Sequence, residues 1–488
     1  MRLGGRLLVV GFMALMTSAH VGSPDAWFEG AAGPYTITVH IEAPPVIPGI
    51  AVVNVRTADS VERITAFVNT FDAEGGTPPP DELVPSADRP GWRSARLWVM
   101  NTGSNRVTVE VRGPLGTGMV VVPLAAVAQR RLAVNTTFIA VVFVGGAILM
   151  AGLLTLIGAA VREGVLESGH VPDDSRRRRA RRAMMRAAVF IALALAGMYS
   201  WWRAEDRAFR ARLYRPLSVA TRVDTSSGGA TFVLAITDSS WLQRDDVALL
   251  RARGELPATG LIDDHGKLMH LFLVSGDGRS AMAHLHPLTR DSVTFTSTLP
   301  PLPAGTYRVF ADIVQASGFT QTLTSQVVVP RLTNADAPLS DGDDSWAVAG
   351  ETTPRVRLDD GTMLSWVRST DTPLRANEEA GLRFLVEPPP GDSALLEPYL
   401  GMRGHAAVVR DDGEVFIHLH PMGTISPAAQ ARLSPVSMHV EPHTARNTSR
   451  TDTLHFPYAF PQPGHYSVWV QVKRKGRILT GSFQAKVE

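Results

Sequence analysis

The feature that most constrains this chain is an uncharged apolar run in its first third. Residues 138–160 contain no charged side chain and are rich in valine, isoleucine, leucine, glycine and alanine. A helix of about 20 such residues crosses a hydrocarbon core about 30 Å thick. The run therefore predicts a transmembrane helix, which we place at residues 134–161.

A second apolar run follows a strongly basic segment. The segment between the runs is crowded with arginines, at positions 176–179, 181, 182 and 186, and Trp201 and Trp202 end the second run. Cytoplasmic loops beside membrane helices carry an excess of arginine, and tryptophan prefers the membrane interface. We predict a cytoplasmic loop at 162–183 and a second transmembrane helix at 184–202. With a net charge of only +2, nothing else in the chain suggests nucleic acid as a partner.

The first 19 residues read as an export signal. Arg2 and Arg6 precede an apolar run, and small residues fill positions 17–19. We therefore predict a cleaved signal peptide at 1–19, with an uncleaved anchor as the alternative. The predicted location is a bacterial inner (plasma) membrane, with most of the mass on the periplasmic side. The chain has no cysteine, which excludes disulfides, thiolate zinc sites and cysteine nucleophiles.

The remaining sequence favours β-structure. Alternating apolar residues, as in Tyr35–Ile41, recur between turns rich in glycine and proline. We predict a mainly β protein with three Ig-like antiparallel β-sandwich domains, the two membrane helices lying between the first and second. The domains are placed at 20–133, 217–330 and 359–488, with a solvated linker at 331–358.

A short histidine motif occurs twice, each time on a predicted hairpin. The two copies are His270 with His284-Leu-His286-Pro, and His405 with His418-Leu-His420-Pro. In the second copy Asp412-Gly413 is a pair favoured in type I′ turns, which would place the first histidine opposite the last. A turn centred near Gly278 does the same in the first copy. Directly opposed and alternate residues share one face of a hairpin, so each copy presents three imidazoles together.

Three imidazoles on one face predict a metal site. Neutral imidazole suits copper, zinc or nickel. Methionines beside the histidines favour copper over zinc, although Met269 is expected to point into the core. The competing interpretation is that the histidines are half-buried structural residues held by backbone carbonyls.

Signal cleavage after Ala19 would make His20 the N-terminal residue, whose α-amine and imidazole chelate copper together. This early histidine and the proline-rich strand turns, such as Pro303-Ala-Gly-Thr-Tyr-Arg-Val309, give a resemblance to periplasmic β-sandwich proteins of the CopC-like and YtkA-like/FixH-like kinds. CopC-like proteins bind copper, which implies that His20 is a further ligand. The two central helices and the doubled histidine motif depart from those families.

The leading hypothesis is a membrane-anchored periplasmic protein that binds copper for sequestration, delivery or sensing, with zinc as the alternative ion. A second hypothesis is an envelope scaffold that binds another protein and has structural histidines. A copper-dependent redox enzyme at the amine of residue 20 is a third. No nucleophile triad, Walker loop or His-Glu-x-x-His motif favours an enzyme.

Overall fold

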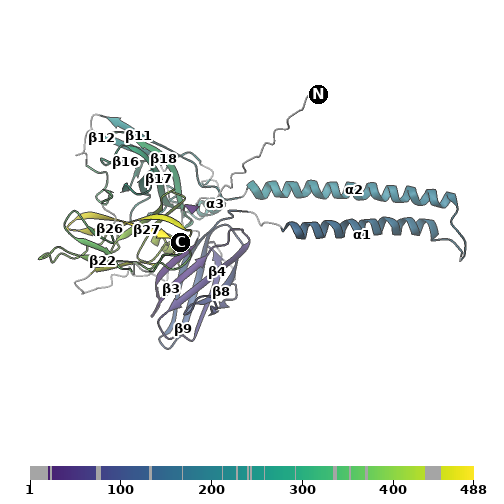
Figure 1. Ribbon diagram of the computed structural model, residues 1–488, viewed down its shortest axis with the longest axis horizontal. Coiled ribbons are helices and arrows are strands. Elements are labelled where there is room, and N and C mark those ends of the chain that lie inside the picture. Colours follow the sequence, from purple (N-terminus) through teal and green to yellow (C-terminus); the bar gives the residue numbers. More distant parts are fainter. Residues whose placement is uncertain are drawn as a thin grey trace, which may run out of the picture. The chain divides into compact units, whose positions relative to one another are not determined.

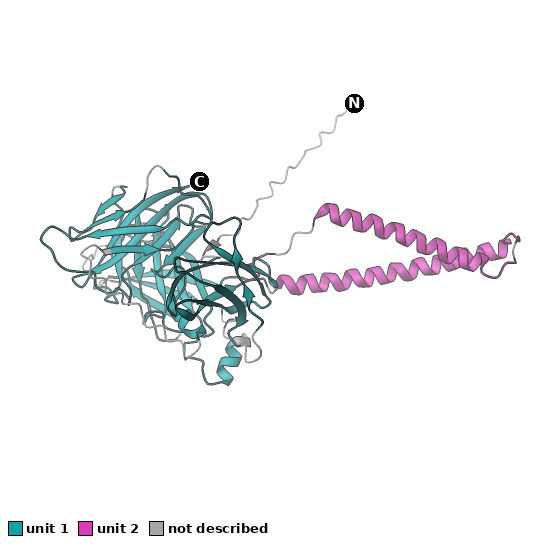
Figure 2. Ribbon diagram, turned by 90° about the horizontal axis from the view of Figure 1, so that it is seen from below, with its two compact units in different colours: residues 1–126, 216–488 teal, residues 127–215 magenta. Residues whose placement is uncertain are grey.

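A computed structural model describes most of the chain. The described residues are 20–21, 25–72, 78–130, 135–167, 169–211, 213–226, 229–238, 241, 245–257, 259–291, 293–332, 338–350, 353–368, 372–434 and 452–488. They form two compact units, residues up to Ala126 together with Pro216–Glu488, and residues Val127–Arg215 (Figure 2). The predicted signal peptide lies outside the described residues.

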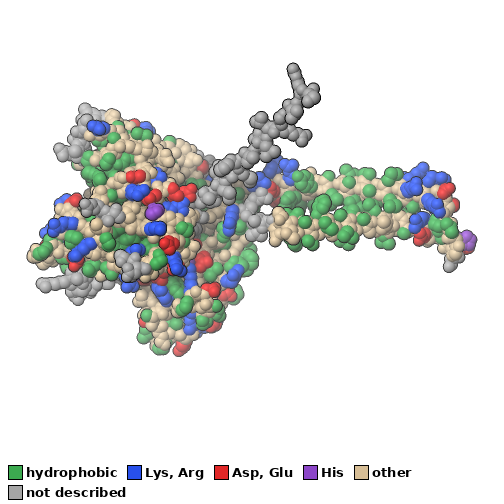
Figure 3. All heavy atoms as spheres, in the orientation of Figure 1, with side chains coloured by type: hydrophobic (Ala, Val, Ile, Leu, Met, Phe, Trp, Pro, Cys, Tyr) green, Lys and Arg blue, Asp and Glu red, His purple; other side chains and the backbone are tan. Residues whose placement is uncertain are grey.

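The smaller unit is a pair of helices that lie side by side, α1 (Thr136–Glu163) and α2 (Asp174–Ala211) (Figure 1). Both are long and apolar enough to cross a membrane, as predicted. Their large apolar side chains are exposed, and Phe143 is 77% accessible. Apolar atoms cover the middle of the pair and basic atoms gather near its ends (Figure 3). The second helix begins inside the predicted loop, because arginine is a good helix former.

The larger unit makes the protein mainly β, with 45% of the described residues in strands and 19% in helices. The first pair of sheets precedes the helices. Its strands are β2 (Ala26–Ala32), β3 (Tyr35–Glu42), β4 (Gly49–Thr57), β8 (Arg93–Val99) and β7 (Val84–Pro85) in one sheet, and β10 (Gly116–Ala126), β9 (Gly103–Gly113), β5 (Arg63–Thr70) and β6 (Asp81–Glu82) in the other. Alternate valines from the strands are fully buried between the sheets.

The second pair of sheets, here called the first repeat, follows the helices. One sheet has β11 (Val219–Ser226), β12 (Gly229–Ile236), β16 (Thr294–Thr298) and β15 (Leu288–Thr289); the other has β18 (Thr320–Val329), β17 (Gly305–Val314), β13 (His270–Ser275), β14 (Ala281–Leu285) and β19 (Ser345–Val348). Leu271 and Leu273 of β13 pack into its core with Phe232 and Phe295. Met269 joins the same core, as predicted. The short helix α3 (Asp245–Ala252) also belongs to this part of the chain.

The third pair, the second repeat, has the same plan. Its sheets are β20 (Arg355–Arg357), β21 (Met363–Trp366), β22 (Leu382–Glu387) and β25 (Asp452–Phe456), and β1 (His20–Val21), β24 (Val415–Leu419), β23 (His405–Arg410), β26 (Gly464–Arg474) and β27 (Arg477–Val487). A short helix, α4 (Pro427–Leu433), follows β24. In both repeats a tyrosine hydroxyl donates to a carbonyl four residues earlier, from Tyr307 to Pro303 and from Tyr466 to Gln462.

The hairpin register agrees with the sequence-based prediction in both repeats. Leu271 pairs with Leu285 and Ala406 pairs with Leu419, which puts the first and last histidine of each motif opposite each other. The predicted type I′ turn is wrong. Gly413 N–H donates to the Arg410 carbonyl at 2.7 Å, and only the glycine, not Asp412, has positive φ. Asp411 and Asp412 therefore form the turn, and the glycine follows it.

The two repeats pack against each other through equivalent faces. The apolar residues of β13 and β23 that point away from their own cores enter a shared apolar cluster. That cluster contains Phe272, Val274, Met282 and Phe310 from the first repeat, and Ala407, Val409, Phe416 and Trp469 from the second. The rings of Phe310 and Phe416 stack at 4.2 Å between centroids. Both faces of each hairpin are consequently buried, and the histidines lie on the face between the repeats.

Two further contacts depart from the predicted domain plan. The segment predicted as a solvated linker, 331–358, contributes β19 to the first repeat, where Ser345 pairs with His284. The first pair of sheets also holds the second repeat: Glu29 N–H donates to Met422 O at 2.9 Å, and Phe28 forms a bridge with Gly423. The loop after His420 is thereby fixed from outside its own repeat.

Candidate metal centre

Seven histidine rings form one continuous group between the two repeats. Neighbouring ring centroids lie between 4.5 and 6.1 Å apart. Six of the rings belong to the histidines predicted as ligands, and the seventh is His265 from the turn before β13. The two predicted sets of three are therefore adjacent rather than separate.

Burial favours the neutral form of all seven rings. Burial removes each ring from water and lowers its pKa below the ordinary value, with the strongest effect at the four histidines of the two His-Leu-His motifs and at His405. A neutral imidazole has one N–H donor and one nitrogen with a free lone pair, which is the form that binds metals.

The first histidine group comprises His270 of β13, His284 of β14 and His286 just after β14, and all three are buried. The outer nitrogens of the first two are oriented by acceptors. His270 Nε2 donates to the Asp264 carbonyl at 3.1 Å, because a carbonyl can only accept. His284 Nδ1 donates to Gln471 Oε1 of the second repeat at 2.9 Å. The amide of Gln471 is held in this orientation because its Nε2 donates to Ser345 Oγ at 2.6 Å.

The third member of this group is oriented by a carboxylate. His286 Nδ1 donates to Asp344 Oδ1 at 3.0 Å, and the backbone N–H of His286 donates to the same oxygen at 2.7 Å. Burial raises the pKa of Asp344 to about 6, so the group is ionised at neutral pH. Hydrogen bonds from an outer nitrogen to a carboxylate, carbonyl or amide are typical of histidines that ligate metals.

These outer bonds leave the inner nitrogens with free lone pairs. His270 Nδ1 and His284 Nε2 lie 3.2 Å apart, and His286 Nε2 has no partner among the described residues. Two nitrogens that both present lone pairs cannot hydrogen bond to each other. Two ligand nitrogens of a tetrahedral metal ion, with metal–nitrogen bonds of about 2.0–2.1 Å, lie about 3.3 Å apart, which is close to the distance between these two atoms. One ring nitrogen from each of the three histidines lies within 4.8 Å of the other two. The first histidine group therefore has the spacing and the protonation of a metal-binding site.

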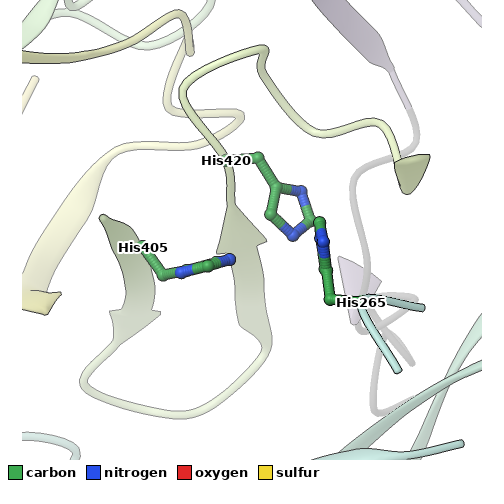
Figure 4. A group of neighbouring side chains, drawn as sticks. All are labelled: His265, His405 and His420. Carbon is green, nitrogen blue, oxygen red and sulfur yellow. The ribbon is translucent and has the colours of Figure 1, made fainter. Parts of the chain in front are cut away.

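The second histidine group comprises His265, His405 and His420 (Figure 4). Each offers a ring nitrogen within 4.8 Å of the other two. Both nitrogens of His405 and of His420, and Nε2 of His265, have no hydrogen-bond partner in the described part of the chain. Buried polar atoms are otherwise nearly always paired, so five unpaired nitrogens at one point need an explanation.

His418 takes a position that the sequence does not predict. It shares a face with His405 and His420, as expected, but its ring also lies 5.2 Å from His270 and 5.4 Å from His284. Its Nδ1 is 3.6 Å from Asp312 Oδ2, and its Nε2 is unpaired among the described residues. His418 thus stands between the two groups rather than in the second one.

Three carboxylates lie beside the histidines: the buried Asp264 and Asp344, and the half-buried Asp312. Burial raises the pKa of Asp312 to about 6, like that of Asp344. Among the described residues their ionic contacts are with histidines, and none pairs with a lysine or arginine. Buried anions are normally compensated by cations. Beside neutral imidazoles, these carboxylates could balance the charge of a metal ion.

The sequence-based prediction missed His265, Gln471 and Asp344. Asp344 was assigned to a solvated linker, and a lone glutamine on a strand carries no sequence signal. The Asp264-His265-Gly266 triplet is a turn signal placed close before His270, which could have indicated His265. The other predicted ligand, His20, lies in β1 opposite Val415. That is three residues before His418, or about 10 Å along the strand, and its side chain is outside the described structure.

Comparisons with known proteins give little about function. Residues 359–488 match the model of a domain of unknown function (DUF8832), and no curated protein matches the chain. An engineered protein of known structure is 25% identical over 20% of this chain and 21% of its own, with a TM-score of 0.15. Dimeric latent PorU from Porphyromonas gingivalis is 9% identical over 95% of this chain and 34% of its own, with a TM-score of 0.16. The chicken CNTN1 FN1–FN3 domains are 8% identical over 92% of this chain and 97% of their own, with a TM-score of 0.13. The chain spans a minor part of the first two, and similarity this low supports no argument.

Proposed function

We propose that this is a membrane-anchored, extracytoplasmic copper-binding protein. The observation that carries the proposal is the first histidine group: three neutral imidazoles whose outer nitrogens are hydrogen bonded and whose free lone pairs converge. The site contains no thiolate, because the chain has no cysteine. Imidazole suits copper, and copper(II) is the divalent ion that nitrogen ligands bind most tightly.

The closed character of the site favours binding and transfer over catalysis. His270, His284 and His286 are each no more than 2% exposed, so a bound ion would have little room for a substrate beside its ligands. Sequestration, delivery or sensing of copper fits such a site. The protein would be built from three Ig-like domains, the last two of which supply the ligands.

The helices and the larger unit both support a proposed membrane arrangement. The arginine-rich beginning of α2, which follows the connection from α1, favours a cytoplasmic position for that end of the helical pair. The contacts of Glu29 and Phe28 with Met422 and Gly423 require that the two flanks of the helical pair share one compartment. We assign that compartment to the periplasmic side of a bacterial inner membrane. Reporter fusions at residue 168 and after residue 488 test this assignment, and opposite locations are expected.

The test of metal binding is equilibrium titration of the full chain in detergent with copper and, separately, with zinc. We expect tight copper uptake that is lost in a variant with His270, His284 and His286 changed to leucine. Uptake of zinc alone would replace copper by zinc in the proposal. If neither ion binds with micromolar or better affinity, the histidines are structural and the proposal fails.

A further inference from the structure

The two repeats carry the same tight turn just before their first histidine. In the first repeat, Asp264 and Lys267 exchange backbone hydrogen bonds at 2.8 and 3.1 Å around His265 and Gly266. In the second, Tyr399 and Met402 do the same at 2.7 and 3.0 Å around Leu400 and Gly401. Both central residues of each turn have positive φ. The turns are therefore equivalent by geometry and by their position five residues before the first histidine.

The equivalent turns carry different side chains. The first repeat has His265 where the second has Leu400, so only one turn offers a ligand. The ring of His265 does not stay with its own repeat: its centroid lies 5.6 Å from His405 and 5.3 Å from His420, against 6.1 Å from His270. The turn is tied to the second repeat as well, because Ala428 N–H of α4 donates to Asp264 Oδ1 at 3.1 Å.

From these observations we infer that the protein has a second metal site that joins the two repeats, made by His265 of the first repeat with His405 and His420 of the second. This inference rests on the proposed function, and it replaces the symmetric ligand set His405, His418 and His420. The chain would then bind two ions in unlike sites, one within the first repeat and one between the repeats.

The two sites differ in how firmly their ligands are held. The imidazoles of the first site are oriented by hydrogen bonds of their outer nitrogens, whereas those of the second have no such partners among the described residues. Outer-shell hydrogen bonds raise metal affinity and fix ring orientation. The second site is therefore the weaker of the two, and its ion is the one that can be released to a partner first.

The natural difference between the turns provides the test. His265→Leu installs the residue that the equivalent turn already tolerates, and His418→Leu removes the ligand of the symmetric alternative. Copper per chain is measured by elemental analysis and by competition with a chromophoric chelator, on full-length protein in detergent. Melting temperatures of the metal-free variants establish that both remain folded.

We expect two copper ions in the wild type, one in His265→Leu and two in His418→Leu. The weaker of the two binding steps should disappear in His265→Leu. Two ions in His265→Leu with one in His418→Leu would overturn the inference and restore the symmetric site. A wild type that binds a single ion, with His265→Leu unchanged, would also overturn it. Either result leaves the first site and the proposed function intact, whereas failure of the wild type to bind any ion would refute both.

Discussion

Gln471 should control the affinity of a metal site in a repeat to which it does not belong. Its Oε1 accepts the Nδ1–H of His284, which leaves Nε2 of that ring bare toward the ion. In Gln471→Leu this acceptor is lost. Loss of such a partner lowers metal affinity by about 10- to 100-fold, or about 1.4 to 2.7 kcal/mol. We expect the lower end, because Tyr399 Oη remains 3.1 Å from the same nitrogen.

The measurement is competition for copper between the full chain and a chromophoric chelator. The number of ions bound should stay at the wild-type value while the tighter dissociation constant rises. Gln321→Leu is the matched control, since it also removes a buried glutamine but one whose partner is Gln315. It should lower stability without changing affinity. An unchanged dissociation constant in Gln471→Leu would refute the role of the outer nitrogen in preparing the site.

Three other outcomes are expected. Burial lowers the pKa of all seven histidines, so below about pH 6.5 the unfolded metal-free chain binds more protons than the folded chain. The free energy of unfolding should therefore be constant above about pH 7.5. On acidification it should fall by up to about 1.4 kcal/mol per pH unit for each histidine. Asp312 and Asp344, with pKa raised to about 6, oppose this below pH 6 but are outnumbered; denaturant midpoints between pH 5.5 and 8 test the net sign. Phe416→Ala should cost about 3–5 kcal/mol of unfolding free energy in denaturant titrations, because its ring fills the cluster between the repeats. Removal of copper with a chelator should lower the melting temperature, and addition of copper should restore it.

The sequence predicted the hairpins of this fold well, because their signals are local. The Asp-Gly turns placed each first histidine opposite its last, although the turn type at Asp412 was wrong. The apolar content of both helices identified them as membrane-spanning candidates, but the helical propensity of the basic segment before the second helix was overlooked.

The packing of the two repeats was not predicted, although a signal existed. In β13 the residues Leu271, Phe272, Leu273 and Val274 are all apolar, and a strand that is apolar on both faces is buried on both. That pattern indicates a second layer but does not name it. His265 and Asp344 could not be placed for the same reason, since each acquires its neighbours from a distant part of the chain.

The contact between the first pair of sheets and the loop after His420 has a consequence for assembly. Trp27 N–H donates to Thr424 Oγ1 at 2.9 Å, across 397 positions of sequence. Contacts of such long range form late in folding. In the proposed membrane arrangement, the first β-domain would keep this edge unpaired until both helices had entered the bilayer and the last repeat had been translocated. Synthesis, insertion and the proposed metal loading would then occur in a fixed order.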